Sequence, residues 1–178
     1  HGLISEDIIL EGNELDLEVG AYRLIGENCY VQESQHLFDV LKTATDHGVE
    51  VVAVINQEGG FEGVVTVQDT MRAFAQTAAV QSPGGILILS MKQLDYSLSE
   101  LARLVESNDA QVLSSSIAPD LHDDTKIRVT LKLNVLDLSR IIATLERFGY
   151  SIIGNFQESS LLSNDKERID ILLKYLDI

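Results

Sequence analysis

The chain contains the run Gly63-Val64-Val65-Thr66-Val67-Gln68-Asp69, and 61 residues earlier it contains a shorter copy, Gly2-Leu3-Ile4-Ser5-Glu6-Asp7. Both copies begin with a glycine, two aliphatic residues and a hydroxyl residue. Self-similarity at such a spacing indicates tandem supersecondary units. We therefore expect two related units, of which the first is cut off at its N-terminus.

The residues around the second copy predict one complete unit. Ser34–His47 has the apolar periodicity of a helix that Ser34 caps, and Gly48 ends this helix. Residues 49–55 form a nearly continuous aliphatic run, which is typical of a buried strand. The turn residues that follow lead into 61–66 as the second arm of a hairpin. A helix is then predicted from 67 to 79.

A break around Pro83 separates this unit from a C-terminal one. The residues after the break predict the order βαββαβ, a four-stranded sheet with both helices on one face. The expected strands are 86–91, 112–117, 127–133 and 150–156, and the expected helices are 97–107 and 137–148. Residues 158–166 read as a loop. A short terminal helix follows, whose apolar side is expected to dock on its own domain or to meet a partner subunit.

Charge and composition exclude several functional classes. Thirteen Lys and Arg stand against 28 Asp and Glu, which gives a formal net charge of −15, and no basic cluster offsets it. Such a field repels phosphate backbones and anionic membrane surfaces, so neither nucleic acid nor a membrane is an expected partner. No apolar run approaches the ~20 residues of a membrane span. The single cysteine, Cys29, cannot form an internal disulfide, which is typical of the cytoplasm.

Thr66 and Asp69 are the sharpest candidate site. A hydroxyl at the start of a helix lies beside free backbone N–H groups and the positive end of the helix dipole, which suits a phosphate. Asp69, one turn later, can accept hydrogen bonds from the hydroxyls of a ribose. The same spacing also fits a capping box, which needs no ligand. Spacing alone leaves both interpretations open.

The stretch from Val51 through Gly63 to Asp69 resembles a CBS domain, and Gly2 to Leu10 resembles the closing part of a preceding one. Members of this family pack as tandem pairs and bind AMP, ADP, ATP or S-adenosylmethionine in clefts between the repeats. The resemblance implies a phosphate contact for Thr66, a ribose contact for Asp69, and nucleotide-binding positions at Gly63 and Ser5. In the first copy Ile8 stands where the family has aspartate, which puts a second site in doubt.

Residues 84–157 resemble an ACT domain in element order and in the run from Ser97 to Ala102. Asp95 and Tyr96 occupy the turn where ligand-binding members carry Pro-Gly. A Cβ there prevents the close approach that glycine allows, so the resemblance implies dimer formation more than an amino-acid effector site. The order CBS, CBS, ACT is similar to the AcuB type of acetoin-utilisation protein.

These resemblances predict an α+β chain of CBS-type repeats followed by a ferredoxin-like βαββαβ domain. The expected parts are 1–20 for the end of a first CBS repeat, 21–81 for the second, 84–157 for the ACT-like domain, and 158–178 for a loop and helix. No metal-ligand spacing and no nucleophile motif occurs. We expect a non-enzymatic cytoplasmic sensor of an adenosine compound, without a required cofactor, that forms a homodimer. A dimerisation scaffold that binds no small molecule is the alternative.

Overall fold

The computed structural model describes residues 2–4, 9–10, 18–22, 26 and 28–157, and its contacts divide the chain into two compact units, residues 1–76 and 77–178. The predicted terminal helix lies outside the described residues. The same holds for Ser5, Asp7 and Ile8 of the first copy.

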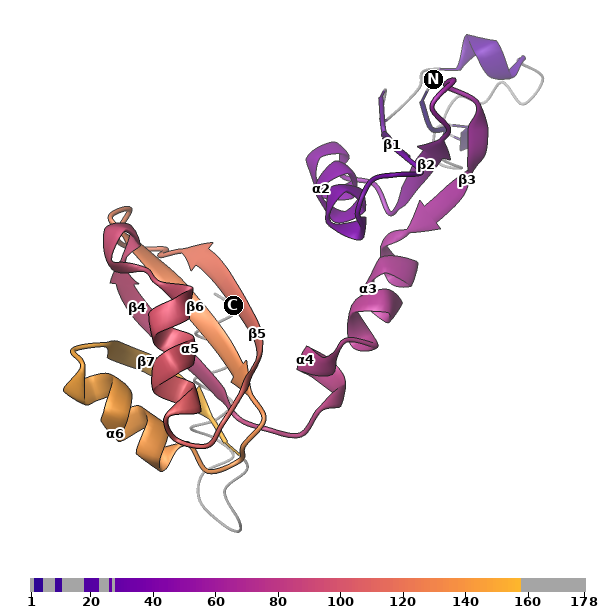
Figure 1. Ribbon diagram of the computed structural model, residues 1–178. Helices are drawn as coiled ribbons and strands as arrows, with labels where there is room; N and C mark the ends of the chain where they lie inside the picture. The colour runs from indigo at the N-terminus through magenta and orange to yellow at the C-terminus, as the bar shows by residue number, and fades with distance from the viewer. Residues whose placement is uncertain (1, 5–8, 11–17, 23–25, 27, 158–178) are drawn as a thin grey trace. The chain divides into compact units, whose positions relative to one another are not determined.

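The first unit is built on a three-stranded sheet (Figure 1). Its elements are η1 (Val19–Ala21), β1 (Tyr30–Gln32), α2 (Leu37–His47), β2 (Val51–Ile55), β3 (Phe61–Thr66) and α3 (Val67–Ala75). The strand order is β1-β2-β3, with β1 parallel and β3 antiparallel to β2. The predicted order of helix, strand, strand and helix is confirmed.

The two faces of this sheet differ. Val31 and Val52 lie on the face toward α2 and form a buried cluster with Val40 and Ala44 of that helix. Because side chains alternate along a strand, the neighbours of these valines lie on the other face. That opposite face carries Tyr30, Ala53 and Val64, which occupy matching positions on the three strands.

Two helix boundaries differ from the prediction. The cap of α2 is His36 and not Ser34: its Nδ1 accepts from the Phe38 amide at 3.2 Å, while Gln35 folds back on Gln32 in a turn that holds Ser34 outside the helix. The helix predicted for 67–79 ends at Ala75, because Thr77 is extended, with φ −73° and ψ 153°. A separate short helix, α4 (Ala78–Gln81), follows.

The second unit has the βαββαβ order predicted from the sequence. It consists of β4 (Ile86–Lys92), η2 (Gln93–Asp95), α5 (Leu98–Glu106), β5 (Val112–Pro119), β6 (Lys126–Leu133), α6 (Ser139–Arg147) and β7 (Ser151–Phe156). The strand order is β5-β6-β4-β7, and every neighbouring pair is antiparallel. Both helices lie on the same side of this sheet in Figure 1.

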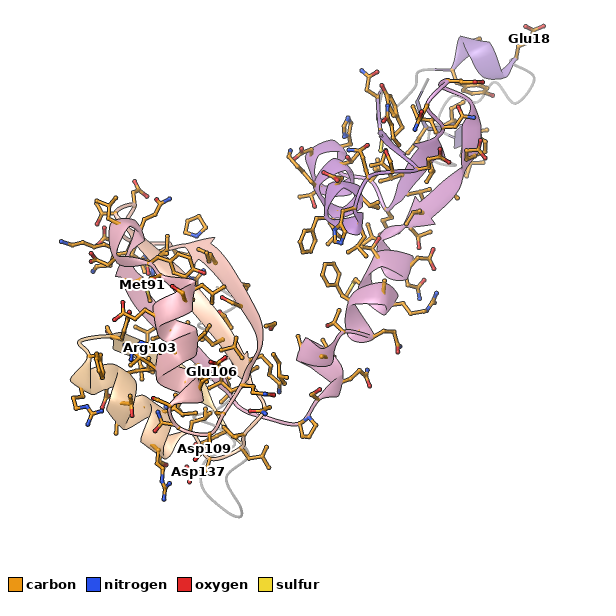
Figure 2. All side chains as sticks on the ribbon, in the orientation of Figure 1. Glu18, Met91, Arg103, Glu106, Asp109 and Asp137 are labelled. Atoms are coloured by element: carbon orange, nitrogen blue, oxygen red, sulfur yellow. The ribbon has the colours of Figure 1, made fainter. Side chains whose placement is uncertain are left out.

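The core of the second unit lies between the sheet and these helices. Alternate residues of β4 and β6 pack against α5 and α6, and the fully buried members include Leu87, Leu131, Leu101 and Leu145. Charged residues such as Arg103 and Glu106 occupy the outer side of α5 (Figure 2). Among the described residues, no helix combines the length and the apolar character needed to span a bilayer.

Candidate functional site

The corner where β3 becomes α3 places Thr66 and Asp69 in mutual contact. The Asp69 amide donates to Thr66 Oγ1 at 2.9 Å, and the Thr66 hydroxyl donates to Asp69 Oδ2 at 2.7 Å. The Thr66 amide also points at Asp69 Oδ2, at 3.4 Å. The two residues therefore form a reciprocal capping box, the arrangement that the ligand-free interpretation predicted.

Asp69 remains ionised in this arrangement. The hydrogen bonds from the Thr66 side chain and backbone lower the pKa of the Asp69 carboxyl, and the Arg72 guanidinium contributes in the same direction. Arg72 Nη1 donates to Asp69 Oδ1 at 2.8 Å, and both side chains are largely exposed. Sequence reasoning missed Arg72, although its i,i+3 spacing from Asp69 could have indicated the pair.

Several backbone N–H groups at this corner already donate hydrogen bonds within the protein. The Val67 amide donates to the Glu50 carbonyl at 2.9 Å, and the Asp69 amide is held by Thr66. A phosphate at this helix N-terminus would therefore compete with bonds inside the protein. The Asp69 carboxylate and the Arg72 guanidinium are the exposed charged groups that a ligand could reach.

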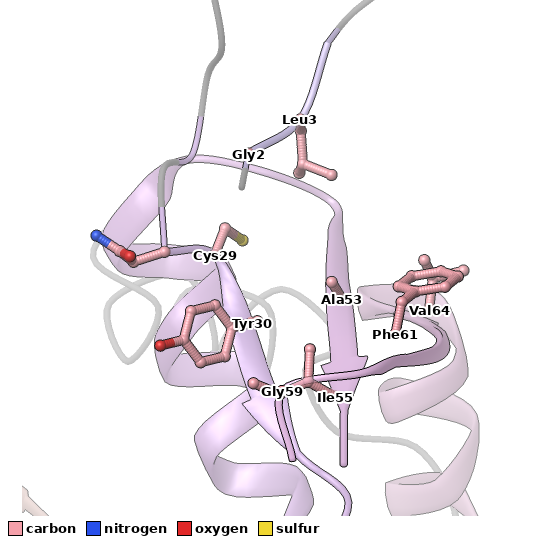
Figure 3. A pocket seen from close by; sticks show the side chains of 10 residues that line it. Gly2, Leu3, Cys29, Tyr30, Ala53, Ile55, Gly59, Phe61 and Val64 are labelled. Carbon is pink, nitrogen blue, oxygen red and sulfur yellow. The ribbon is translucent and has the colours of Figure 1, made fainter. Parts of the chain in front are cut away.

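A pocket of about 430 Å³ opens in the first unit, and its wall is mainly apolar (Figure 3). Tyr30, Ala53, Ile55, Phe61 and Val64 contribute side chains from all three strands, and Cys29 lies at its edge. Phe61 is 70% exposed and Tyr30 is 40% exposed. Burial raises the pKa of the Cys29 thiol, so the thiol form is favoured there.

The pocket and the corner share one face of the sheet. Ala53 pairs with Val64, and the next pair on the same face is Val51 with Thr66. Two residues of strand correspond to roughly 7 Å. The sheet therefore aligns an apolar hollow and the Thr66–Asp69 pair along one strand. Sequence reasoning missed this pocket because it did not predict β1, which brings Tyr30 beside Ala53 of the β2–β3 hairpin.

The other candidate residues are not part of this arrangement. Gly63 pairs with Val54, on the sheet face opposite Thr66, and a Cβ there would meet nothing within 4 Å. Asp95 ends η2 in the second unit, and Tyr96 packs against that unit's core. Within the part of the chain that the structure describes, no group of His, Cys, Asp and Glu could hold a metal ion.

Comparisons with known proteins add little to this description. A scan against protein-family models found no match, and a search of the curated proteins found no significant match. Among solved structures, the chain is similar to a CBS domain protein from Shewanella oneidensis MR-1, with 25% identity and a TM-score of 0.32. That match covers 42% of this chain and 59% of the other. At this TM-score the match does not establish a common fold. The fold is therefore described only as two units, each of which combines helices with one β-sheet.

Proposed function

We propose that the chain is a non-enzymatic regulatory protein whose first unit is a CBS-type module that binds an adenosine compound. The observation that supports this most is the alignment of the apolar pocket with Thr66 and Asp69 on one sheet face. In this proposal the second unit is an ACT-like, ferredoxin-like domain that forms dimers. The order of the two units would then be that of the AcuB type.

The pocket suits a flat heteroaromatic base. A volume of about 430 Å³ falls in the range of small-molecule sites. Tyr30 and Phe61 offer aromatic rings at the rim, and such rings favour offset or edge contacts with other aromatic groups. The small side chain of Ala53 leaves room on the floor between them.

The ribose would lie toward α3. The ionised Asp69 carboxylate accepts from Thr66 and Arg72, and a carboxylate has about four acceptor positions, so it retains capacity for a ribose hydroxyl. Arg72 is exposed and can exchange its contact with Asp69 for one with a phosphate. Its guanidinium would then replace the backbone donors that are already engaged.

The charge of the first unit favours ligands with little negative charge. Residues 1–76 contain 3 Lys and Arg against 14 Asp and Glu. A field of this sign raises the cost of bringing a polyphosphate to the pocket. We therefore expect AMP or S-adenosylmethionine to bind more tightly than ATP. Binding would act by linkage, because a ligand shifts a conformational equilibrium by its differential affinity for the two states.

The test is a binding titration and thermal-shift series of AMP, ADP, ATP and S-adenosylmethionine against the whole chain. Ligand at 100 times its Kd should add about 2.7 kcal/mol of stability. Ala53→Leu should abolish the shift because it fills the pocket without touching the cap. Asp46→Asn, on the exposed side of α2, is the control and should bind normally. A shift that survives Ala53→Leu, or no shift with any compound, would refute the sensor.

A dimerisation scaffold that binds no small molecule is the second candidate function, and one observation favours it. β5 is an edge strand of eight residues without a charged side chain. Natural edge strands are protected by charges, proline or bulges; β5 has a register shift between Val112 and Ser114 and a proline at its last residue, so the uncharged run from Ser114 to Ala118 is the part open to pairing with another strand. We expect a homodimer through β5, and Ser116→Lys should convert it to a monomer in sedimentation experiments. Glu106→Lys, on α5, is the matched control.

A further inference from the structure

The second unit has a sheet face that its helices do not cover, here called the back face. In β4 and β6 it consists of Ile86, Ile88 and Ser90 with their partners Lys132, Thr130 and Arg128. The residues between them, such as Leu87 and Val129, point into the core beneath α5 and α6. β7 adds Phe156 beside Ile86, and β5 adds Ser116 beside Thr130.

The back face is less accessible than an open sheet face would be. Ile88 is only 3% exposed, and the other five residues of this set are half-buried. The last pair on the same face, Lys92 and Lys126, is exposed. Burial is therefore greatest at Ile88 and falls toward Lys92 and Lys126, so the shielded part of the back face includes the end that holds Ile86 and Phe156. Two faces of a sheet that are both shielded indicate a layer on each side.

The described part of the chain ends beside this end of the back face. Gln157, the last described residue, follows Phe156 directly, and its Oε1 accepts from the Leu138 amide at 3.1 Å. Ile86, Lys132, Phe156 and Gln157 help to line a hollow of about 310 Å³ there. The 21 residues of segment 158–178 thus begin at the buried end of the back face.

The sequence of this segment fits a buried helix. Asp170, Lys174 and Asp177 recur at i, i+4 and i+7, so on a helix they would share one narrow polar strip, whereas the other seven residues of 169–178 are apolar or aromatic. Ten residues of helix measure about 15 Å, which is shorter than the roughly 23 Å of a seven-residue strand. The eleven residues before them reach up to about 36 Å, enough to return across the sheet.

Charge also favours this pairing. Arg128 and Lys132 are the charged residues among the six on the back face, and both are basic. Segment 158–178 has five acidic residues against three basic ones. We propose that residues 169–178 dock as an amphipathic helix on the back face of their own unit, which closes the second unit as a three-layer structure. The docked segment blocks face-to-face packing of two sheets and leaves the β5 edge available for pairing.

Paramagnetic broadening tests this placement. A spin label at Ser116→Cys reports from the back face, and one at Glu106→Cys reports from the outer side of α5 (Figure 2). Cys29→Ser removes the native thiol from both variants. We expect the Ser116 label to remove most of the amide signal intensity of residues 169–176 and the Glu106 label to leave it unchanged. Equal broadening by both labels, or by neither, would overturn the proposal.

Three further samples make the result specific. Leu173→Asp places a charge on the apolar side of the segment and should abolish the broadening, whereas Lys174→Asp, on the polar strip, should preserve it. A mixture of isotope-labelled chains without spin label and chains without isotope that carry the label at Ser151→Cys, which lies on the back face of β7 at the sheet edge opposite β5, should show no broadening. Broadening in the mixture would mean that the segment covers a second copy, which contradicts docking within one chain.

Discussion

Asp123 is the residue whose ionisation the structure perturbs most clearly. Its Oδ1 accepts from the Thr125 hydroxyl at 2.6 Å and from the Thr125 amide at 3.0 Å, and its Oδ2 lies 3.1 Å from Lys126 Nζ. These contacts, led by the Thr125 hydroxyl, lower the pKa of Asp123 to about 2. Because the folded pKa is below that of the unfolded chain, the contribution to stability is present at neutral pH and disappears between about pH 4 and 2.

We predict that Thr125→Val raises the pKa of Asp123 because it removes the strongest donor and keeps the backbone one. A carboxyl-detected NMR titration measures this change. Lys126→Gln should also raise the pKa of Asp123, since it removes both a hydrogen bond and a positive charge beside the carboxylate. An unchanged Asp123 pKa in Thr125→Val would show that the turn around Thr125 is not held by its hydroxyl.

A second prediction for a single residue concerns Thr66, which caps α3. Removing an N-cap hydroxyl typically costs about 1 kcal/mol, so Thr66→Ala should lower the free energy of unfolding of the first unit by that amount. Thr66→Ser retains the acceptor for the Asp69 amide and should remain within a few tenths of a kcal/mol. Urea unfolding of the ligand-free protein measures both variants. Equal stability of the alanine and serine variants would contradict the capping role.

At the scale of elements, two glycines determine how β4 starts. Gly84 has φ +148°, and a Cβ there would lie 1.8 Å from the Leu133 carbonyl oxygen. The adjacent Gly85 exchanges backbone hydrogen bonds with residues at the end of β6, donating to Val135 at 2.7 Å and accepting from Leu133 at 2.9 Å. The close approach of these two chain segments requires the absence of a side chain at Gly84.

Gly84→Ala should therefore destabilise the second unit by more than about 2 kcal/mol, because strain and a backbone clash combine. Gly149→Ala is the matched comparison. That glycine also has a positive φ, +86°, but its Cβ would meet nothing within 4 Å, so a loss of only about 1 kcal/mol is expected. Denaturant midpoints that do not differ between the two variants would disprove the importance of the contact with Leu133.

The sequence predicted elements best where one periodic signal dominated. β6 alternates between buried and half-buried residues as its sequence alternates between aliphatic and polar ones, because one face meets the helices. The start of α5 was also predictable, since Ser97 accepts from the Glu100 amide. The cap at His36 was not, because histidine is an uncommon N-cap and Ser34 offered a stronger local signal.

The candidate site was only partly predictable from the sequence. The spacing of Thr66 and Asp69 predicted their contact. The same side-chain atoms can cap a helix or bind a ligand, so the spacing could not separate these two roles. The pocket depends on the register that places Tyr30 of β1 beside Ala53 of β2 and Ala53 beside Val64. The β2–β3 register follows from their hairpin, whereas the pairing of β1 with β2 is a tertiary contact, and β1 was not among the strands predicted from the sequence.

At the scale of the whole molecule, charge and core are distributed unequally between the units. Residues 1–76 hold 3 basic and 14 acidic residues, whereas residues 77–178 hold 10 and 14. The described buried core is also larger in the second unit, where two helices cover the sheet. The unit with the pocket thus carries most of the net negative charge, and this affects any anionic ligand.

The affinity of the proposed site for ATP should therefore rise with salt concentration, whereas binding that depends on ion pairs weakens with salt. At low ionic strength the acidic first unit repels ATP more than AMP, so AMP should bind more tightly. Salt near 0.15 M shortens the screening length from about 30 Å at 0.01 M to about 8 Å, which should strengthen ATP binding and narrow the difference. Calorimetric titrations at both ionic strengths measure this. If salt instead weakens binding, and weakens the binding of ATP most and that of AMP least, a local contact such as the one with Arg72 outweighs the field of the unit.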